Sequence, residues 1–307
     1  MGAPKPLVPV IVGPTAVGKT AVAMALRHHW SLAVISADSR QVYRRLDIGT
    51  AKPSDEERRL VPHLGLDIIE PGERYSAGRF ARDAAAWLGE VAVKHQPVVV
   101  GGTGFYVRAL ADGLFREPPI DSARRDRLRQ WARTASELGV WAARLDPGYR
   151  GGGRQRAARA VEVGLLTGRP LSWWQAQAKA QGIMRPWYVR LTLPRAVLRR
   201  RIDGRVTRML REGLIDEVRG LLADGVPGDA PGLDGVGYRE VVQHLRGDLT
   251  REALPDAIAT ATRRYAKRQE TWFRHQLIGH AVITLDATDD SELLASRVAE
   301  LWEERRT

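Results

Sequence analysis

The sequence predicts an α/β protein, a P-loop NTPase-like parallel sheet interrupted by a helical insertion. A glycine-rich loop follows a short apolar run near the start of the chain, and short apolar runs alternate with helical periodicity at both ends. Strand signals are absent between residues 117 and 186. Such alternation is typical of a parallel sheet covered by helices. We therefore expect a core formed by residues 1–116 and 187–307, with 117–186 as a helical domain.

The elements follow from the apolar pattern and from its breaks. The expected strands are Val8–Val12, Leu32–Ser36, Pro97–Val100, Trp187–Leu193 and Ala281–Leu285. The expected helices outside the insertion are Ala21–Trp30, Ala77–Lys94, Val197–Asp224 and Leu254–His275. Gly225–Gly237 is rich in Gly, Pro and Asp and is expected to be a loop.

The loop after the first strand reads GPTAVGKT and fits the pattern G-x-x-x-x-G-K-[ST]. Its glycines let backbone amides close around phosphate oxygens at the start of a helix. Lys19 is expected to neutralise the terminal phosphates, and the Thr20 hydroxyl to ligate Mg²⁺. The predicted diphosphate-binding residues here are Gly13, Pro14, Thr15, Ala16, Val17, Gly18, Lys19 and Thr20.

Composition excludes several classes of protein. The 307 residues contain no cysteine, so disulfides, thiolate zinc sites and cysteine nucleophiles are ruled out. There is also no asparagine, which removes the N-K-x-D motif of ordinary GTPases. No apolar run reaches about 18 residues, and the N-terminus lacks the regions of a secretory signal. We expect a cytoplasmic protein without a membrane segment.

Positive charge is concentrated in one part of the chain. The formal net charge is +12, and Asp121 to Arg219 alone contains 22 Lys and Arg against 9 Asp and Glu. A basic block beside a nearly neutral phosphate-binding core suggests a polyanion longer than a nucleotide. The alternative is a solvated, arginine-rich surface that reflects genomic composition.

Polar residues follow two further expected strands. Asp38 comes after the second strand, and Thr103 lies in the GGTG turn after the third. Because ligands of open α/β sheets bind beyond the carboxyl ends of the strands, both should lie near the glycine loop. Asp38 is a candidate Mg²⁺ ligand, general base or helix N-cap. The GGTG segment is also compatible with a simple tight turn.

Longer strings resemble one family. DSRQVYRRLDIGTAKP (38–53), flanked by GPTAVGKT and GGTGFYVRAL, is similar to the bacterial tRNA dimethylallyltransferases. RAVEVGLLTGRPLS (159–172), GVGYRE (235–240) and RRYAKRQETWFRHQ (263–276) match the same family in the same order. The resemblance implies transfer of a dimethylallyl group from dimethylallyl diphosphate to the exocyclic amine of the adenosine 3′-adjacent to the anticodon. Diphosphate is released, and the loop holds it rather than hydrolysing ATP.

The resemblance also implies roles for individual residues. Asp38 becomes the general base for the adenine amine, Thr103 positions that amine, and Arg205 contacts the diphosphate. The target base would be flipped out of the anticodon loop. The implied tRNA contacts are Ser39, Arg40, Gln41, Arg125, Gln155, Arg156, Arg159, Gly237, Tyr238 and Arg239. Mg²⁺ is the implied cofactor, the anticodon stem-loop is the implied partner, and we expect a monomer.

Two rival functions use the same loop. A small-molecule or nucleoside kinase would turn over ATP and has no need of the basic segment. An RNA-binding NTPase would show nucleotide-dependent RNA affinity and leave no modified base. The specificity of the 38–53 string argues against both.

Overall fold

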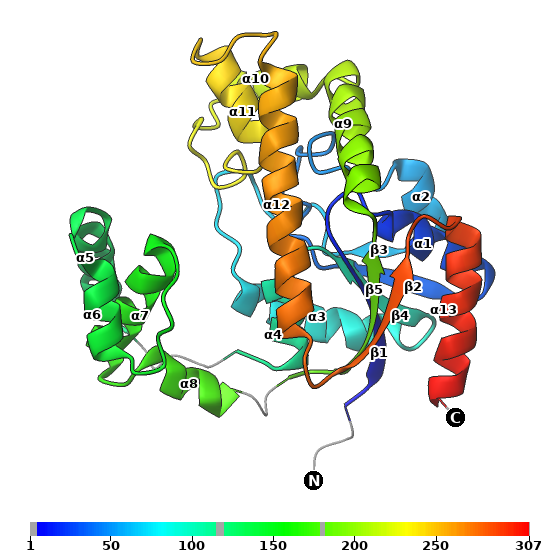
Figure 1. The fold of residues 1–307 in the computed structure, drawn as a ribbon, viewed down its shortest axis with the longest axis horizontal. Helices are drawn as coiled ribbons and strands as arrows, with labels where there is room; N and C mark the ends of the chain where they lie inside the picture. The colour runs from blue at the N-terminus through cyan, green and yellow to red at the C-terminus, as the bar shows by residue number, and fades with distance from the viewer. Residues whose placement is uncertain (1–4, 115–119, 179–181, 307) are drawn as a thin grey trace. The chain divides into compact units, whose positions relative to one another are not determined.

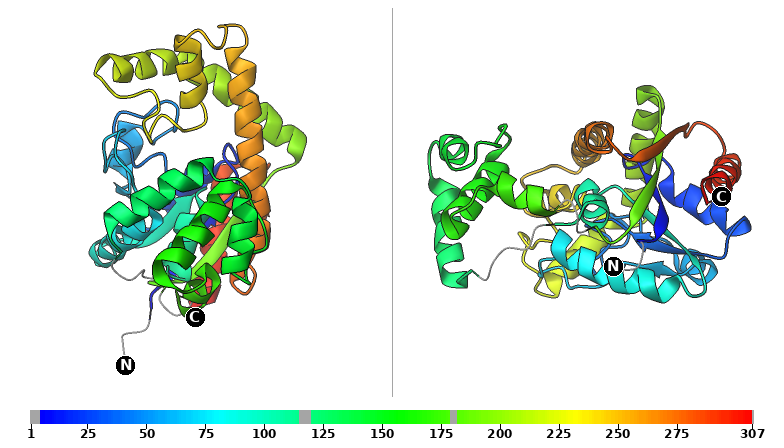
Figure 2. Two further views of the ribbon diagram at one scale, coloured as in Figure 1. Left: turned by 90° about the vertical axis from the view of Figure 1, so that its left-hand side faces the viewer. Right: turned by 90° about the horizontal axis from the view of Figure 1, so that it is seen from below.

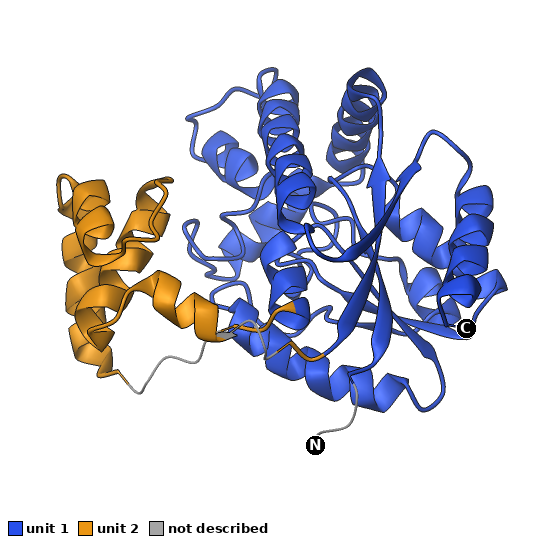
Figure 3. Ribbon diagram, turned by 60° about the horizontal axis from the view of Figure 1, so that its bottom comes forward, with its two compact units in different colours: residues 1–111, 184–307 blue, residues 112–183 orange. Residues whose placement is uncertain are grey.

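The computed structural model describes residues 5–114, 120–178 and 182–306. They form two compact units (Figure 3), one made of residues 1–111 and 184–307, the other of residues 112–183. We call these unit 1 and unit 2. The sequence predicts the insertion over 117–186; its first predicted boundary, between residues 116 and 117, lies outside the described residues.

Unit 1 is a mixed α/β structure around one parallel sheet (Figure 1). Its strands are β1 (Leu7–Val12), β2 (Leu32–Ser36), β3 (His63–Leu64), β4 (Gln96–Gly101), β5 (Arg185–Thr192) and β6 (Ala281–Asp286). The order across the sheet is β3-β2-β4-β1-β5-β6, and each neighbouring pair is parallel. The five strands expected from apolar runs are confirmed to within two residues at each end. β3 has two residues, too few to show a pattern.

The central strands are buried on both faces. Val8 and Val10 through Val12 in β1 are fully buried, which explains why the strand reads as a continuous apolar run. β1 pairs with β4 on one side and with β5 on the other, and the second pairing joins Leu7 to Arg185. β1 is thus the middle of the sheet, and the glycine-rich loop emerges from its carboxyl end.

Helices cover both faces of the sheet (Figure 2). Those of unit 1 are α1 (Lys19–Ala25), α2 (Asp55–Leu60), α3 (Ala77–Val91), α4 (Gly104–Ala111), α9 (Arg195–Arg211), α10 (Leu214–Ala223), α11 (Tyr238–Leu245), α12 (Leu254–Gln276) and α13 (Ser291–Arg306). A short 3₁₀ turn, η1 (Leu26–His28), extends α1. α1 and α13 share one apolar cluster with the sheet, in which Trp302 is 2% exposed. α3 and α4 pack together, with Phe80 stacked on Tyr106 at 4.4 Å.

One predicted helix is two helices in the structure. The sequence predicts Val197–Asp224 as continuous, but α9 ends at Arg211 and α10 begins at Leu214. Gly213 lies between them with φ of +102°, a left-handed conformation that glycine adopts at no steric cost. The periodic pattern continues across this glycine, which is why it does not reveal the break.

Unit 2 contains α5 (Ser122–Thr134), α6 (Leu138–Leu145), α7 (Arg154–Thr167) and α8 (Leu171–Ala178). Its small core is built largely from alanines of α5, α6 and α7, which let helices approach closely. None of the helices in the described part of the chain has the length and hydrophobicity that a membrane crossing requires.

Candidate active site

The glycine-rich loop between β1 and α1 is a tight turn whose geometry depends on its glycines. Gly18 has φ of +108° and Ala16 has φ of +64°, both in the left-handed region. A Cβ at Gly13 would lie 2.7 Å from the Leu191 carbonyl oxygen, so a larger residue could not fit there. The loop therefore presses against the end of β5.

Two side chains from distant segments hold this loop. Gln269 on α12 accepts from the Thr15 amide at 2.8 Å and donates to the Gly102 carbonyl at 2.9 Å. Arg201 on α9 donates to the Val17 carbonyl at 3.0 Å. Neither residue was predicted for the site. Gln269 lies in the 263–276 string that resembles the family, but that string does not connect it to a loop far away in the chain, and Arg201 lies in none of the strings. Together they tie the loop to α9, α12 and the end of β4.

Lys19 lies over the loop with its charge partly desolvated. Its Nζ donates to the carbonyls of Gly13 and Pro14 at 3.1 and 2.9 Å. Burial lowers the pKa of Lys19 to about 8; Asp38 raises it and Arg205 lowers it further. Burial likewise lowers the pKa of Arg205, again against the pull of Asp38. The charges of Lys19, Arg205 and Asp38 thus interact in a poorly solvated space.

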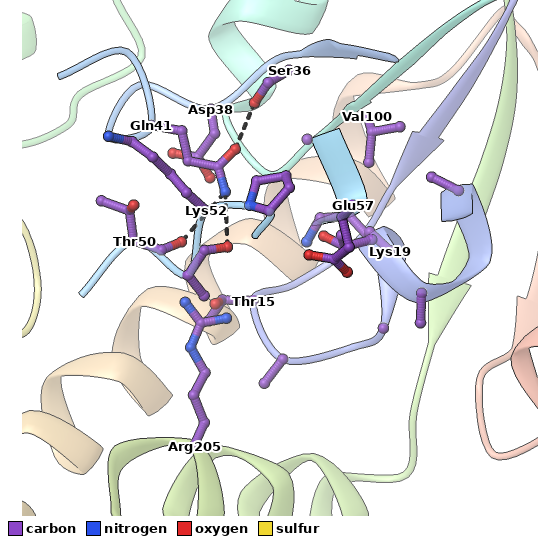
Figure 4. A pocket seen from close by; sticks show the side chains of 18 of the residues that line it. Thr15, Lys19, Ser36, Asp38, Gln41, Thr50, Lys52, Glu57, Val100 and Arg205 are labelled. Atoms are coloured by element: carbon purple, nitrogen blue, oxygen red, sulfur yellow. Dashed lines mark hydrogen bonds between the residues drawn. The ribbon is translucent and has the colours of Figure 1, made fainter. Parts of the chain in front are cut away.

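That space is a cavity of about 800 Å³ (Figure 4). The predicted site residues that line it are Thr15, Ala16, Gly18, Lys19, Thr20, Asp38, Gln41 and Arg205. The remaining loop positions form the turn behind it. The cavity also has lining residues that were not predicted for the site, among them Thr50, Lys52, Glu57, His63, Arg208 and Tyr265. Burial raises the pKa of Tyr265 to about 12, and nearby Asp38 adds to the shift.

Asp38 extends from the end of β2 into this cavity. Its Oδ1 accepts from the Arg40 amide at 2.8 Å, a local turn contact. The helix N-cap alternative is wrong, because the chain after Asp38 forms turns, and the next helix begins at Asp55 with Ser54 as its cap. The candidate roles that remain for Asp38 are those of a base or a metal ligand.

Thr103 is close to the Asp38 segment but does not line the cavity. Its hydroxyl accepts from the Ser39 amide at 2.9 Å and donates to the Ser39 hydroxyl at 3.2 Å. A Cβ at Gly101 would lie 2.2 Å from the Ala37 carbonyl, so the ends of β2 and β4 meet with no room for a side chain. In this structure Thr103 therefore positions the backbone that carries Asp38.

The residues expected to contact RNA from α11 differ in exposure. The guanidinium of Arg239 is half exposed and pairs with Glu240. Tyr238 is 1% exposed and donates its hydroxyl to Glu217 at 2.6 Å. The resemblance implies a tRNA contact for Tyr238, but a ring buried to this extent leaves no exposed face on which a base could stack. Gly237, at the start of α11, has φ of +96°. Near this segment, Arg40 donates to the Pro231 carbonyl at 2.8 Å.

The basic block divides between the two units. α9 in unit 1 carries seven arginines. Those that line the cavity are Arg201, Arg205, Arg208 and Arg211. Part of the basic block of residues 121–219 thus lies beside the glycine-rich loop, outside the insertion predicted over residues 117–186.

In unit 2, two of the arginines expected to bind RNA and a third arginine that was not predicted, Arg129, surround one buried carboxylate. Arg125, Arg129 and Arg159 approach Glu162 at 3.6, 2.7 and 2.5 Å. The Glu162 side chain is 8% exposed. Gln155 lines a groove of about 370 Å³ beside it. Arg156, on α7, is exposed.

The fold and this cavity define an α/β protein with a glycine-rich loop at the carboxyl edge of a parallel sheet. Comparison with known proteins narrows the class. A family model described as IPP transferase matches residues 41–276, and one described as isopentenyl transferase matches residues 6–66. The chain belongs to the IPP transferase family.

Individual relatives support this assignment to the family. A tRNA dimethylallyltransferase of Geobacter metallireducens is 42% identical over 277 residues, covering 86% of this chain and 88% of that protein. One from Anaeromyxobacter dehalogenans is 41% identical over 298 residues, covering 95% and 96%. The crystal structure of the full-length tRNA isopentenylpyrophosphate transferase of Bacillus halodurans has a TM-score of 0.73 at 33% identity, covering 98% and 96% of the two chains.

Proposed function

We propose that this protein transfers a dimethylallyl group from dimethylallyl diphosphate to the exocyclic amine of the adenosine 3′-adjacent to the anticodon in tRNA. The observation that carries the proposal is the grouping of Lys19, Arg205 and Asp38 around one cavity beside a phosphate-type loop. Its relatives bear the names of enzymes with this activity. In this proposal the core is P-loop NTPase-like, and its loop holds diphosphate.

In the reaction, a bond forms between the adenine nitrogen and the first carbon of the prenyl group. The bond from that carbon to the diphosphate oxygen breaks, and diphosphate leaves with the electron pair. Lys19 and Arg205 stabilise the negative charge that grows on the leaving group. The amine loses a proton as it is alkylated, and Asp38 accepts it. A positioned base typically contributes about 10²–10⁴-fold to the rate.

Mg²⁺ is the proposed cofactor. The described residues contain no cluster of three or more His, Asp or Glu side chains arranged for a metal. The Thr20 hydroxyl and the Asp38 carboxylate nevertheless line the cavity that Lys19 occupies. This oxygen-poor set fits Mg²⁺ held by one or two protein oxygens, with the rest supplied by phosphate and water. When bound, the ion would supply further neutralisation of diphosphate charge.

RNA binding is proposed for unit 2 and for the residues flanking the cavity. The proposed contacts with the anticodon stem-loop in unit 2 are Arg125, Gln155, Arg156 and Arg159. Those in unit 1 are Ser39, Arg40, Gln41, Gly237 and Arg239. Phosphate contacts of this kind offset the few kcal/mol needed to unstack the target adenosine. A cytoplasmic, monomeric enzyme fits this proposal.

The test is incorporation of labelled dimethylallyl diphosphate into unmodified tRNA with an adenosine beside the anticodon, with labelled ATP in parallel. Label in that adenosine from the prenyl donor alone is the expected result. Phosphate released or moved from ATP without prenyl transfer would refute the proposal and favour the kinase or NTPase alternative.

A further inference from the structure

The carboxylate of Glu217 on α10 binds the backbone of a loop that leads into the cavity wall. The amides of Asp47 and Ile48 donate to its Oε2 at 2.9 and 2.8 Å. The amide of Gly49 donates to its Oε1 at 3.4 Å. Hydrogen bonds to an ionised carboxylate are about twice as strong as those between neutral groups. Glu217 therefore fixes three consecutive peptide groups.

Tyr238 on α11 completes this contact. Its hydroxyl donates to Glu217 Oε1 at 2.6 Å. A Cβ on Gly49 would lie 2.4 Å from the Tyr238 ring, so the loop reaches the ring only because Gly49 has no side chain. Burial raises the pKa of Tyr238 well above its ordinary value, as does the Glu217 carboxylate beside it. The hydroxyl thus stays protonated and continues to donate.

The same loop is held from its inner side by Lys52. The Lys52 ammonium donates to the Tyr43 carbonyl at 2.6 Å and to the carboxylates of Asp47 and Asp67 at 2.6 and 2.5 Å. Its side chain is 1% exposed. The loop is therefore anchored at both ends, by Glu217 before residue 50 and by Lys52 after residue 51.

Between these anchors, Thr50 and Ala51 form part of the cavity wall. Their carbonyls accept from the side-chain amide of Gln41 at 3.4 and 3.2 Å, and Gln41 in turn accepts from Ser36 at 2.7 Å. Figure 4 places Gln41 and Thr50 on the same side of the cavity as Asp38. A shift of residues 50–51 would therefore move groups next to the proposed base.

Neither Glu217 nor Tyr238 lines the cavity. We propose that both are positioning residues for the group transfer: they hold the 47–51 backbone so that the wall beside Asp38 keeps its shape. This inference rests on the function proposed above. It predicts a defect in the chemical step, because the diphosphate is held elsewhere, by the glycine-rich loop and Arg205.

Two variants test the inference. Tyr238→Phe keeps the ring against Gly49 and removes one hydrogen bond, and Glu217→Gln removes the charge. Asp146→Asn in unit 2 is the matched control. Asp146 is 4% exposed, and it accepts from the Gly148 and Ser172 amides at 2.8 and 3.0 Å. It is thus also a buried carboxylate that binds backbone, but it does not line this cavity.

The measurements are kcat and KM for the prenyl donor at saturating tRNA, the melting temperature, and hydrogen exchange of the 44–52 segment. A misplacement of about 1 Å can lower a rate by up to 10²-fold, so we expect kcat to fall about tenfold in both variants. The donor KM should stay within about twofold, since binding of the diphosphate is unchanged. The amides of residues 47–49 should exchange faster, while Asp146→Asn should lower the melting temperature and keep kcat.

The outcomes separate the two proposals. A wild-type protein that transfers no prenyl group would refute the proposed function and this inference with it. If the wild type is active and Tyr238→Phe has the same kcat and the same hydrogen exchange at residues 47–49, this inference is overturned, and the proposed function is not. The inference would also be overturned if Asp146→Asn and Tyr238→Phe had the same melting temperature and lost the same amount of kcat.

Discussion

Raising the pH from 7 to 9 is expected to weaken binding of the diphosphate donor, because Lys19 loses its charge in this range. Burial lowers the pKa of this residue to about 8. With that pKa, about nine tenths of Lys19 is charged at pH 7 and about one tenth at pH 9. If the charged form alone binds diphosphate tightly, the affinity falls roughly tenfold, equivalent to about 1.4 kcal/mol.

Titration calorimetry with dimethylallyl diphosphate at pH 7, 8 and 9, in two buffers of different ionisation enthalpy, measures this effect. A terminal phosphate with a last pKa of about 6 is about nine tenths ionised at pH 7 and almost fully ionised at pH 8 and 9, so proton uptake at pH 8 and 9 reports the protein. About half a proton should be taken up at pH 8, when about half of Lys19 is neutral. Lys19→Arg is the matched control, since arginine stays charged and should bind without this dependence. Equal affinity of the wild type at pH 7 and 9 would refute the reasoning.

The same group affects folding of the ligand-free protein with a defined sign. Unfolded Lys19 keeps its proton up to its ordinary pKa of 10.5, while folded Lys19 loses it near 8. Since the unfolded state binds more protons between these values, the contribution of Lys19 to the free energy of unfolding rises as the pH increases from about 8 to 10.5.

Three further outcomes are expected. Asp38→Ala should lower kcat by about 10²–10⁴-fold and leave tRNA affinity nearly unchanged, because a base acts mainly in the transition state. Replacing Arg156 and Arg159 with alanine should weaken tRNA binding and lower the slope of log affinity against log salt by about 0.7–0.9 per lost phosphate contact. Gly101→Ala should lower the free energy of unfolding by about 1–3 kcal/mol in a denaturant titration, because its methyl group would overlap the Ala37 carbonyl.

Each of these three predictions has a control variant elsewhere in the chain. Asp38→Asn keeps an acceptor for the Arg40 amide and lacks the base, so it should be as slow as Asp38→Ala; equal loss of affinity and rate would contradict the role of a base. Arg297→Ala on α13 removes an exposed charge from unit 1. An equal change in salt slope in that variant would indicate that Arg156 and Arg159 belong to a solvated surface. Gly89→Ala in α3, where a Cβ meets nothing within 4 Å, should instead stabilise by about 0.5–1 kcal/mol.

Local sequence patterns predicted the features of the fold that depend on residues close together in the chain. The strand–loop–helix around Lys19 and the strands β2 and β4 follow from apolar runs and glycines, which specify backbone directly. The position of Asp38 at the sheet edge follows from parallel topology. The seven-arginine helix was visible as charge, and the family resemblance placed only its Arg205 beside the diphosphate. The lining positions of Arg201, Arg208 and Arg211 were not predicted.

What the sequence did not reveal depends on contacts between distant residues. Gln269 reaches Thr15, and Glu217 reaches the amides of residues 47–49, across long stretches of chain. The sequence around a polar side chain on an amphipathic helix does not indicate which distant group it will bind by hydrogen bonds. Tyr238 shows the same limit: a tyrosine after a glycine fits a stacking surface or a buried hydrogen bond equally well, and only the fold decides.

The position of β1 in the sheet bears on how the protein is made. Chains emerge from the ribosome N-terminus first, and domains generally fold as units. β1 is synthesised before unit 2, yet one of its two edges pairs with β5, which follows the whole of unit 2. Trp302, in the last helix, completes the apolar cluster over the sheet. Until β5 has been made, the edge of β1 that pairs with it is open, and open strand edges are known templates for aggregation. Unit 2, whose contacts are local in sequence, can fold before β5 is made, and the core of unit 1 is complete only after α13 has been made.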